Sequence, residues 1–162
     1  MFRAMRRKRQ ELTKDETIQI IERATSGVLA VLGDDGYPYS VPLSHFYRDG
    51  KLYFHCATEG HKLDAIKRCE KVSFCVIEKD EVVPEKYTTY FRSVIAFGKI
   101  RILTDEQEKY NAIDALAQRF NPGDAEGRAK EIADSMGRMC VLEMTIEHMT
   151  GKEARELMER RG

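Results

Sequence analysis

Residues 58–62, Thr-Glu-Gly-His-Lys, have the types and spacing of a phosphate-binding turn. They follow an apolar strand pattern and precede apolar residues at helical spacing, so the turn sits at a helix start, where free N–H groups and the helix dipole attract anions. Lys62 would supply charge, His61 and Thr58 directional hydrogen bonds, and Gly60 a close approach of backbone. The same residues also suit a plain helix cap with exposed polar side chains, and the motif alone leaves both interpretations open.

Metal binding has less support from the sequence than phosphate binding. His55, Cys56, His61 and Cys69 have ligand chemistry, but residues 55 and 56 are neighbours on an expected strand and point to opposite faces. No ligand pair has the spacing of a zinc knuckle, so we expect no metal site. His148 stands alone and is expected to be structural.

Hydrolytic and nucleotide-binding motifs are absent from the sequence. It contains no G-x-S-x-G elbow, no P-loop and no G-x-G-x-x-G turn. Ser44 and His45 are adjacent on an expected strand and face apart. His45 is a candidate general acid by residue type alone, and a packed strand histidine is the alternative. We therefore name no catalytic residue.

The composition is that of one globular domain spanning residues 1–162. The chain has 27 Lys and Arg against 27 Asp and Glu, and a zero net charge argues against whole-domain nucleic-acid binding. No run approaches the roughly 20 apolar residues of a membrane helix. The four cysteines form no C-x-x-C pair and no export signal is present, so we expect reduced thiols and a cytoplasmic protein.

Positive charge is concentrated in the first residues. A basic leader, residues 1–12, carries five Lys or Arg among its first nine residues. It either touches a phosphate or an acidic partner, or it is a solvated segment packed against a neighbouring surface.

Periodicity predicts six strands with helices around them. Thr13 and Glu16 have capping-box spacing for a helix over 14–25, and a second box is expected at 104–107. Apolar runs and alternation predict strands at 28–32, 37–47, 51–56, 72–78, 90–103 and 139–146, with a loop at 79–87. Gly98 is expected to mark a bulge or bend. Helical spacing is seen within 63–69, 110–120, 129–136 and 151–161, so 105–137 forms a helical insertion before the last strand.

This pattern predicts a mainly β fold with α additions. Most strands are joined by tight turns, and no repeated strand–helix units indicate a parallel sheet. We expect a small antiparallel barrel flanked by helices.

Four segments of the sequence are specific enough to identify a family: residues 36–43 (GYPYSVPL), the turn 48–50 (RDG), 52–57 (LYFHCA) and 59–63 (EGHKL). Through them the sequence resembles the pyridoxamine 5′-phosphate oxidase-like flavoproteins, in particular the branch related to nitroimidazole-resistance proteins. The leader 5–8, residues 92–95 with Gly98, and 150–153 are similar to the same branch. The segment from 105 to 137 matches no motif of this family.

The resemblance implies a six-stranded split β-barrel homodimer with FMN at the subunit interface. It places His61 and Lys62 at the FMN phosphate, and the backbone of Ser40 and Val41 along the isoalloxazine edge. The end of the 51–56 strand would lie beneath the ribityl chain and ring, and Ser93 on the long strand would approach the flavin. The implied cofactor residues are Ser40, Val41, His55, Cys56, Ala57, Thr58, His61, Lys62 and Ser93.

The implied function is an FMN-dependent reductase that takes hydride from NAD(P)H and delivers it to a small acceptor such as a nitro-aromatic. A pyridoxamine 5′-phosphate oxidase activity is disfavoured, because the Arg-rich phosphate segment of those enzymes has no match in residues 147–162. The alternatives are a non-enzymatic flavin- or haem-binding module, for which His148 is the free-standing axial candidate, and an empty barrel used for protein interaction.

Overall fold

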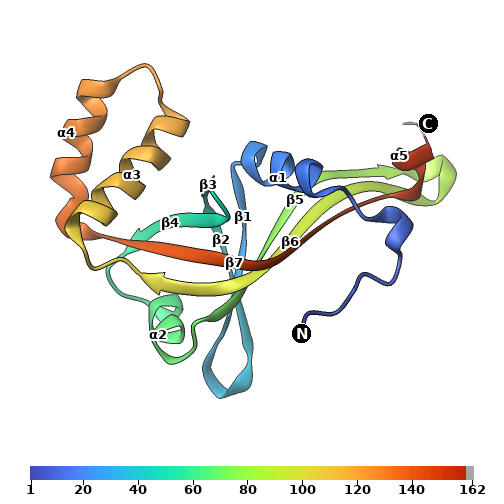
Figure 1. The fold of residues 1–162 in the computed structure, drawn as a ribbon, viewed down its shortest axis with the longest axis horizontal. Helices are drawn as coiled ribbons and strands as arrows, with labels where there is room; N and C mark the ends of the chain where they lie inside the picture. Colours follow the sequence, from blue (N-terminus) through green and yellow to red (C-terminus); the bar gives the residue numbers. More distant parts are fainter. Residues whose placement is uncertain (160–162) are drawn as a thin grey trace.

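Seven antiparallel strands form a single sheet with helices around it (Figure 1). The computed structural model describes residues 1–159. The strands are β1 (Ser26–Leu32), β2 (Pro38–Ser44), β3 (Phe46–Arg48), β4 (Lys51–Ala57), β5 (Lys71–Val83), β6 (Thr88–Ile102) and β7 (Met139–Glu153). Their order in the sheet is β2-β1-β5-β6-β7-β4-β3.

The helices gather at different parts of this sheet. They are α1 (Lys14–Arg23), α2 (His61–Arg68), α3 (Glu106–Phe120), α4 (Ala125–Ser135) and α5 (Arg155–Glu159), with short 3-10 turns η1 (Lys8–Gln10), η2 (Asp34–Gly36), η3 (Pro84–Lys86) and η4 (Met136–Arg138). In Figure 1, α3 and α4 stand together at one end of the molecule, while the leader and α5 lie at the other. Among the described residues, no helix is long and apolar enough to cross a membrane.

The strand order forces the sheet to coil. β2 and β3 are joined by the single residue His45, yet they occupy opposite edges of the sheet. A chain can satisfy both conditions only if the sheet curls until its two edges approach each other, and β2 does contact β4. The result is an open, split barrel, which confirms the predicted mainly β class with flanking helices.

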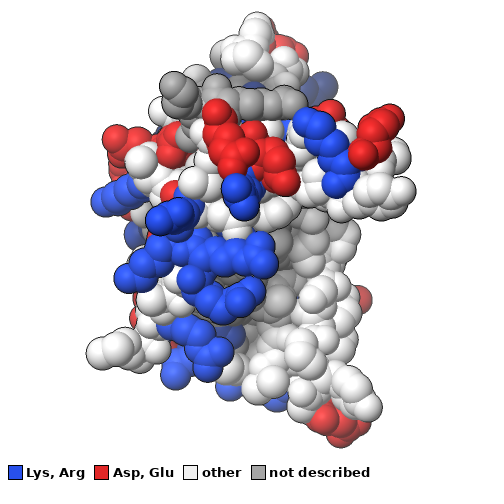
Figure 2. All heavy atoms as spheres, turned by 90° about the vertical axis from the view of Figure 1, so that its right-hand side faces the viewer, with Lys and Arg blue, Asp and Glu red and all other residues white. Residues whose placement is uncertain are grey.

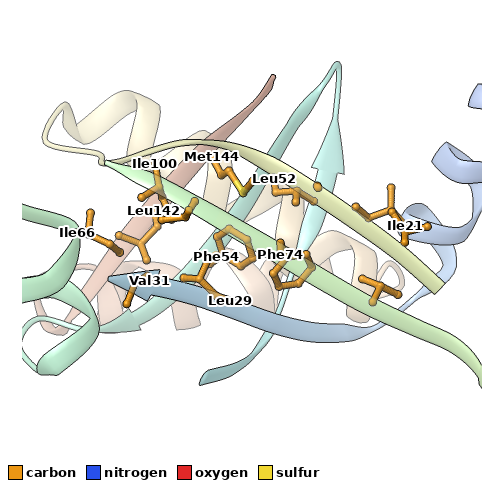
Figure 3. Packing of buried hydrophobic residues seen from close by; sticks show 14 of the residues in the cluster. Ile21, Leu29, Val31, Leu52, Phe54, Ile66, Phe74, Ile100, Leu142 and Met144 are labelled. Carbon is orange, nitrogen blue, oxygen red and sulfur yellow. The ribbon is translucent and has the colours of Figure 1, made fainter. Parts of the chain in front are cut away.

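Alternating side chains from the strands fill the barrel (Figure 3). Phe54 of β4, Phe74 of β5 and Leu142 of β7 are all fully buried. The rings of Phe54 and Phe74 meet edge to face, with centroids 5.1 Å apart. Each such side chain stabilises the fold by roughly 1.5–3 kcal/mol through burial, so the core rather than the connecting turns holds the barrel together.

His45 is buried where the two edges are joined. It is 0% exposed, its Nε2 donates to the carbonyl of Ile21 at 2.7 Å, and its ring meets Phe74 edge-on. The Nδ1 atom has no hydrogen-bond partner within the described chain. Burial, opposed by the Ile21 hydrogen bond and reinforced by the charge of Arg119, lowers the pKa of His45 to about 4. The imidazole is therefore neutral at physiological pH.

Arg119, near the end of α3, ties three segments to one another. Its guanidinium donates to the carbonyls of His45 at 2.6 Å and Ala24 at 2.5 Å, and also to that of Glu22. These carbonyls lie at the end of α1 and at the β2–β3 junction. A cation at a helix C-terminus is stabilised by the helix dipole, so Arg119 fixes α3 against the barrel.

The local sequence signals were mostly confirmed. Thr13 and Glu16 form the expected capping box of α1. The ladder between β6 and β7 shifts register at Gly98, where a Cβ atom would lie 2.0 Å from the carbonyl oxygen of Thr145. The second capping box was wrong: Asp105, not Thr104, caps α3, accepting from the N–H of Glu108 at 2.8 Å.

Several predicted elements differ in extent from the structure, and the strand predicted at 139–146 is one of them, since β7 runs to Glu153. The 37–47 strand divides at His45, which makes seven strands instead of six. The predicted loop at 79–87 was wrong, because β5 continues to Val83 and pairs with β6 up to Thr88. Most of this hairpin arm is exposed on both faces, so its residues show no alternation of apolar and polar types.

The predicted helix over 151–161 was also wrong in extent. β7 continues to Glu153, which pairs with Arg92 of β6 in the ladder and through a 3.0 Å ion pair. Only Arg155–Glu159 is helical, and positions 160 and 161 lie outside the described residues.

We expect His45 to make the protein sensitive to mild acid. The unfolded chain takes up a proton near pH 6.5, whereas the folded chain does so only near pH 4. Stability is therefore fully present above pH 6.5 and is lost as the pH falls toward 4, by about 3 kcal/mol from this group. Urea unfolding of the wild type and of His45→Gln at pH 7.0 and pH 4.5 measures this contribution as the difference between the two pH dependences.

His148→Gln, at a half-buried position, is the control for the His45 prediction. Its unfolding free energy should fall with pH as in the wild type. Equal pH dependence in the wild type and His45→Gln would contradict the prediction.

Candidate functional site

The start of α2 presents unpaired backbone donors. Gly60 precedes the helix with a φ of 133°, a conformation that favours glycine, and no side chain caps the helix. The carbonyl of Gly60 accepts from the N–H of Leu63 at 2.9 Å, which begins the helical bonding. The N–H groups of His61 and Lys62 come before Leu63, the first residue that donates to the Gly60 carbonyl, so they have no acceptor within the helix. This is the geometry that binds anions at helix starts.

Lys62 brings a positive charge to the same place. Within residues 1–159 its ammonium has no carboxylate partner at ion-pair distance, in contrast to Lys67 on the same helix, which lies 3.9 Å from Asp64. The charge of Lys62 acts on the thiol of Cys56 at the end of β4. Lys62 is thus close enough to the end of β4 for its charge to act there, and its role as a phosphate ligand stays a prediction.

His61 is held by neighbours that the sequence analysis missed. Its ring lies against that of Tyr39 on β2, with centroids 4.2 Å apart. Its Nε2 is 3.4 Å from Asp34 Oδ2, and the other carboxylate oxygen of Asp34 accepts from Arg68 at 2.6 Å. The contact with Tyr39 brings β2 next to the α2 turn. No short sequence motif predicts this contact, because it depends on the coiling of the sheet.

Cys56 faces Cys140 across the β4–β7 ladder. The two residues are register partners, and Cys140 is buried. Burial raises the pKa of the Cys56 thiol to about 11; Lys62 acts in the opposite direction, while Cys140 raises the pKa further. Both cysteines, like the other two in the chain, are free thiols. Cys56 is therefore protonated at neutral pH and can act as an apolar wall of the site.

His55 lies on the other face of β4. Its exposed side chain lines a hollow of about 480 Å³ between the strand end and helices α3 and α4. Ile113, Leu116, Phe120 and Met139 supply much of the apolar lining. The volume is in the range of small-molecule sites, roughly 300–1,000 Å³. The end of β4 thus has the α2 turn on one side and this apolar hollow on the other.

Ser40 and Val41 lie on β2, at an open edge of the sheet. β2 carries prolines at positions 38 and 42, and a proline nitrogen is tolerated where the backbone faces away from the neighbouring strand. Ser40 has the same parity as both prolines, so its N–H and C=O point toward the open edge, while Val41 bonds to β1. These backbone groups are available to a planar, hydrogen-bonding ligand.

The model of the family described as pyridoxamine 5′-phosphate oxidase matches residues 13–153, which is most of the chain. The chain belongs to the pyridoxamine 5′-phosphate oxidase family. The family shares the split barrel described above, and the matched residues include the α2 turn, the end of β4 and the β2 edge. No curated protein matches the chain.

Several solved structures share this fold at low sequence identity. A candidate 5-nitroimidazole antibiotic resistance protein from Bacteroides thetaiotaomicron has a TM-score of 0.74 at 22% identity, over 88% of this chain and 86% of that one. The flavocytochrome Anf3 from Azotobacter vinelandii has a TM-score of 0.75 at 21% identity, over 93% of this chain and 72% of that one.

A FAD and heme binding protein from Mycobacterium smegmatis is similar to the same extent. Its TM-score is 0.75 at 18% identity, over 94% of this chain and 80% of that one. The pyridoxamine 5′-phosphate oxidase fold is thus one that other proteins use to bind flavin. At such identities the likeness establishes the fold alone.

Ser93 lies apart from the other family positions. Leu142 of β7 pairs with Phe54 of β4 and with Ile102 of β6, near the α2 end of the sheet. Ser93 is nine residues further along β6, which is about 30 Å at 3.3 Å per residue. Six of the nine positions implied by the family lie at the end of β4 and the start of α2, and the contact of Tyr39 with His61 brings β2, which carries Ser40 and Val41, beside that turn. Ser93 lies elsewhere, on β6.

His148 lies in an aromatic cluster with the leader. The His148 ring stacks on Phe2 of the leader, with centroids 4.9 Å apart and an angle of 8° between planes. The ring of Phe97 belongs to the same cluster, with its centroid 6.4 Å from that of His148.

Among the described residues, no group of three or more His, Cys, Asp or Glu side chains is arranged to hold a metal ion.

We expect Cys56 to react slowly with alkylating reagents at neutral pH. A thiol whose pKa is about 11 holds little thiolate at pH 7, so the rate should rise about tenfold per pH unit up to pH 9. Lys62→Ala should slow the reaction further, because it removes the charge that favours thiolate. Iodoacetamide labelling followed by peptide mass spectrometry measures the rate at Cys56 alone.

Lys67→Ala, on the exposed face of α2, is the matched control for the Cys56 measurement and should leave the rate unchanged. Complete labelling of Cys56 at pH 7 on the timescale of a free thiol would show that the site does not bury this sulfur.

Proposed function

We propose that this chain is an FMN-binding reductase that takes hydride from NAD(P)H and passes it to a small acceptor such as a nitro-aromatic. The observation that carries the proposal is Lys62, a cation with no carboxylate partner among the described residues, beside the free N–H groups that begin α2. A buried phosphomonoester needs such charge-assisted donors. The four free thiols suit a reducing compartment, so we place the protein in the cytoplasm.

The donors of the site match the parts of FMN. Lys62, His61 and the first N–H groups of α2 would hold the phosphate, with Thr58 as a hydroxyl donor in the same turn. The outward N–H and C=O of Ser40 would meet the polar edge of the ring system. Cys56 and Ala57, at the end of β4, are small side chains that leave room for the ribityl chain. These donor types fit FMN, and FAD shares the same phosphate and ring.

Bound FMN would supply a ring that accepts hydride and passes on one or two electrons. The residues of this chain would position the substrates and control access of water. A small planar acceptor would have to stack on the flavin ring to receive hydride, so its place would be beside the β2 edge and not in the hollow lined by His55, which lies on the other face of β4. His45 is excluded as a proton donor, because it is fully buried and its pKa is lowered to about 4.

A homodimer would explain the distant position of Ser93. Within one protomer Ser93 lies about 30 Å along β6 from the α2 end of the sheet. A second copy, packed so that its β6 covers the first copy's β2 edge, would bring this residue to the flavin. We propose such a dimer, with FMN at the interface. Sedimentation velocity on the full chain measures its mass.

Haem binding by the same fold is the alternative. His148, whose ring stacks on Phe2 of the leader, is the axial candidate. A visible spectrum distinguishes the two: flavin gives a double band and haem a Soret band. A preparation with only a Soret band would overturn the flavin assignment.

Lys62→Ala should weaken FMN binding. Removing a charge-assisted hydrogen bond costs roughly 1.5–3 kcal/mol, which corresponds to a Kd about 10- to 150-fold higher. Quenching of FMN fluorescence in a titration with the protein measures Kd. Lys67→Ala, which removes the same charge one turn further along α2, should bind FMN like the wild type. Unchanged affinity in Lys62→Ala would reject the phosphate assignment.

Reductase activity has a separate test. Anaerobic mixing of the yellow protein with NADH or NADPH should bleach the visible absorption, and addition of a nitro-aromatic compound should restore it. The absorbance is followed in a stopped-flow instrument, with sodium dithionite as the positive control for reduction. A protein bleached by dithionite but by neither nucleotide binds flavin without being the proposed reductase.

A further inference from the structure

The basic leader forms a positively charged hollow at the end of the molecule opposite to α3 and α4. Its volume is about 910 Å³, and its cations are Arg6, Arg7, Lys8, Arg9 and Arg155. Gln10, Met158 and Glu159 complete the lining. Figure 2 shows Lys and Arg side chains gathered on this face of the molecule. We call this feature the leader hollow.

The charge of the leader hollow is not balanced within the described chain. Glu159 is the one carboxylate in its lining, and it already pairs with Arg155 at 2.7 Å. The four cations at positions 6–9 have no carboxylate within ion-pair distance among residues 1–159. Other arginines of the protein do have carboxylate partners, as Arg92 does with Glu153. Neighbouring like charges repel, and a bound anion would relieve that repulsion.

The backbone that carries these cations is fixed to the barrel. Gln10 is buried, and its side chain donates to the carbonyl of Glu153 at 3.0 Å. The N–H of Leu12 donates to the carbonyl of Gly151 at 2.9 Å, and Glu11 forms a bridge with Lys152. The turn η1 contacts α5, which brings Arg155 to the opposite wall. The hollow therefore exists before a ligand arrives, which lowers the entropic cost of binding.

The size and shape of the leader hollow limit which kinds of anion it can bind. At about 910 Å³ it is far larger than a single phosphate and falls in the range of small-molecule sites, roughly 300–1,000 Å³. It is concave, whereas a nucleic-acid surface is an extended basic stripe, and the chain as a whole has zero net charge. Arginine forks match phosphate oxygens in pairs, and Met158 adds an apolar surface beside them.

We propose that the leader hollow binds the di- or triphosphate group of a free nucleotide. This site is distinct from the α2 turn, because η1 and α5 lie at the C-terminal end of β7, while Lys62 follows the strand paired with its N-terminal end. The proposal does not depend on flavin binding. The four cations at positions 6–9 supply the unbalanced charge, Arg155 forms the opposite wall, and the fixed turn η1 supplies the geometry.

The test measures binding of inorganic tripolyphosphate, pyrophosphate and phosphate to the full chain by titration calorimetry. We expect affinity to rise with the number of phosphates, ATP to bind at least as tightly as tripolyphosphate, and affinity to fall at least tenfold from 50 to 200 mM NaCl. The double variant Arg6→Ala/Arg7→Ala should lose at least tenfold in tripolyphosphate affinity. Both side chains are exposed, so the fold should persist, and a thermal melt checks it.

Two further variants keep the result interpretable. Lys130→Ala/Arg138→Ala removes the same charge from exposed positions on α4 and η4 and should leave affinity unchanged. Arg155→Ala, on the opposite wall, should lose at least threefold. Absence of tripolyphosphate binding would overturn the proposal, as would equal losses in the control. Tighter binding of a single-stranded oligonucleotide than of ATP would also overturn it, and would identify a nucleic-acid surface.

Discussion

One residue, His45, joins the two strands that form opposite edges of the sheet, and the architecture depends on this connection. A link of one residue can join opposite edges only if the sheet coils. The coil brings the β2 edge beside α2, so that Tyr39 contacts His61. The junction is held from both sides, because His45 bonds the carbonyl of Ile21 and Arg119 bonds the carbonyl of His45. The candidate site is thus a consequence of how the barrel is closed.

Charged side chains have two different roles in this protein. The buried carboxylate of Glu143 accepts from Arg101 at 2.9 Å and Lys51 at 3.1 Å. Burial alone would raise the pKa of Glu143, but these hydrogen bonds outweigh it and hold the pKa below its usual range. Such pairs fasten neighbouring strands. Lys62 has no carboxylate partner in the described part of the chain, and for that reason its charge is available to a ligand.

Local sequence patterns correctly predicted those structural features that depend on interactions between neighbouring residues. The capping box of α1, the bulge at Gly98 and the helix start at residue 61 all follow from a few neighbouring residues. The family resemblance added the split barrel. Sequence reasoning failed where long-range contacts decide. The β5–β6 arm shows no alternation because both faces are solvated, and the approach of Tyr39 to His61 requires the whole sheet to coil. The separation of Ser93 from the α2 turn likewise depends on strand register.

The prolines of β2 have a consequence beyond the orientation of Ser40. An unpaired strand edge is a template on which another chain can add a strand, and this is how folded proteins polymerise or exchange segments. Pro38 and Pro42 interrupt the row of N–H donors that such an added strand would need. The β2 edge can therefore stay unpaired without recruiting a foreign strand, and a subunit that covers it would do so without extending its ladder. A small molecule with few hydrogen-bonding groups can use the short stretch between the prolines, whereas a polypeptide cannot form a continuous ladder there.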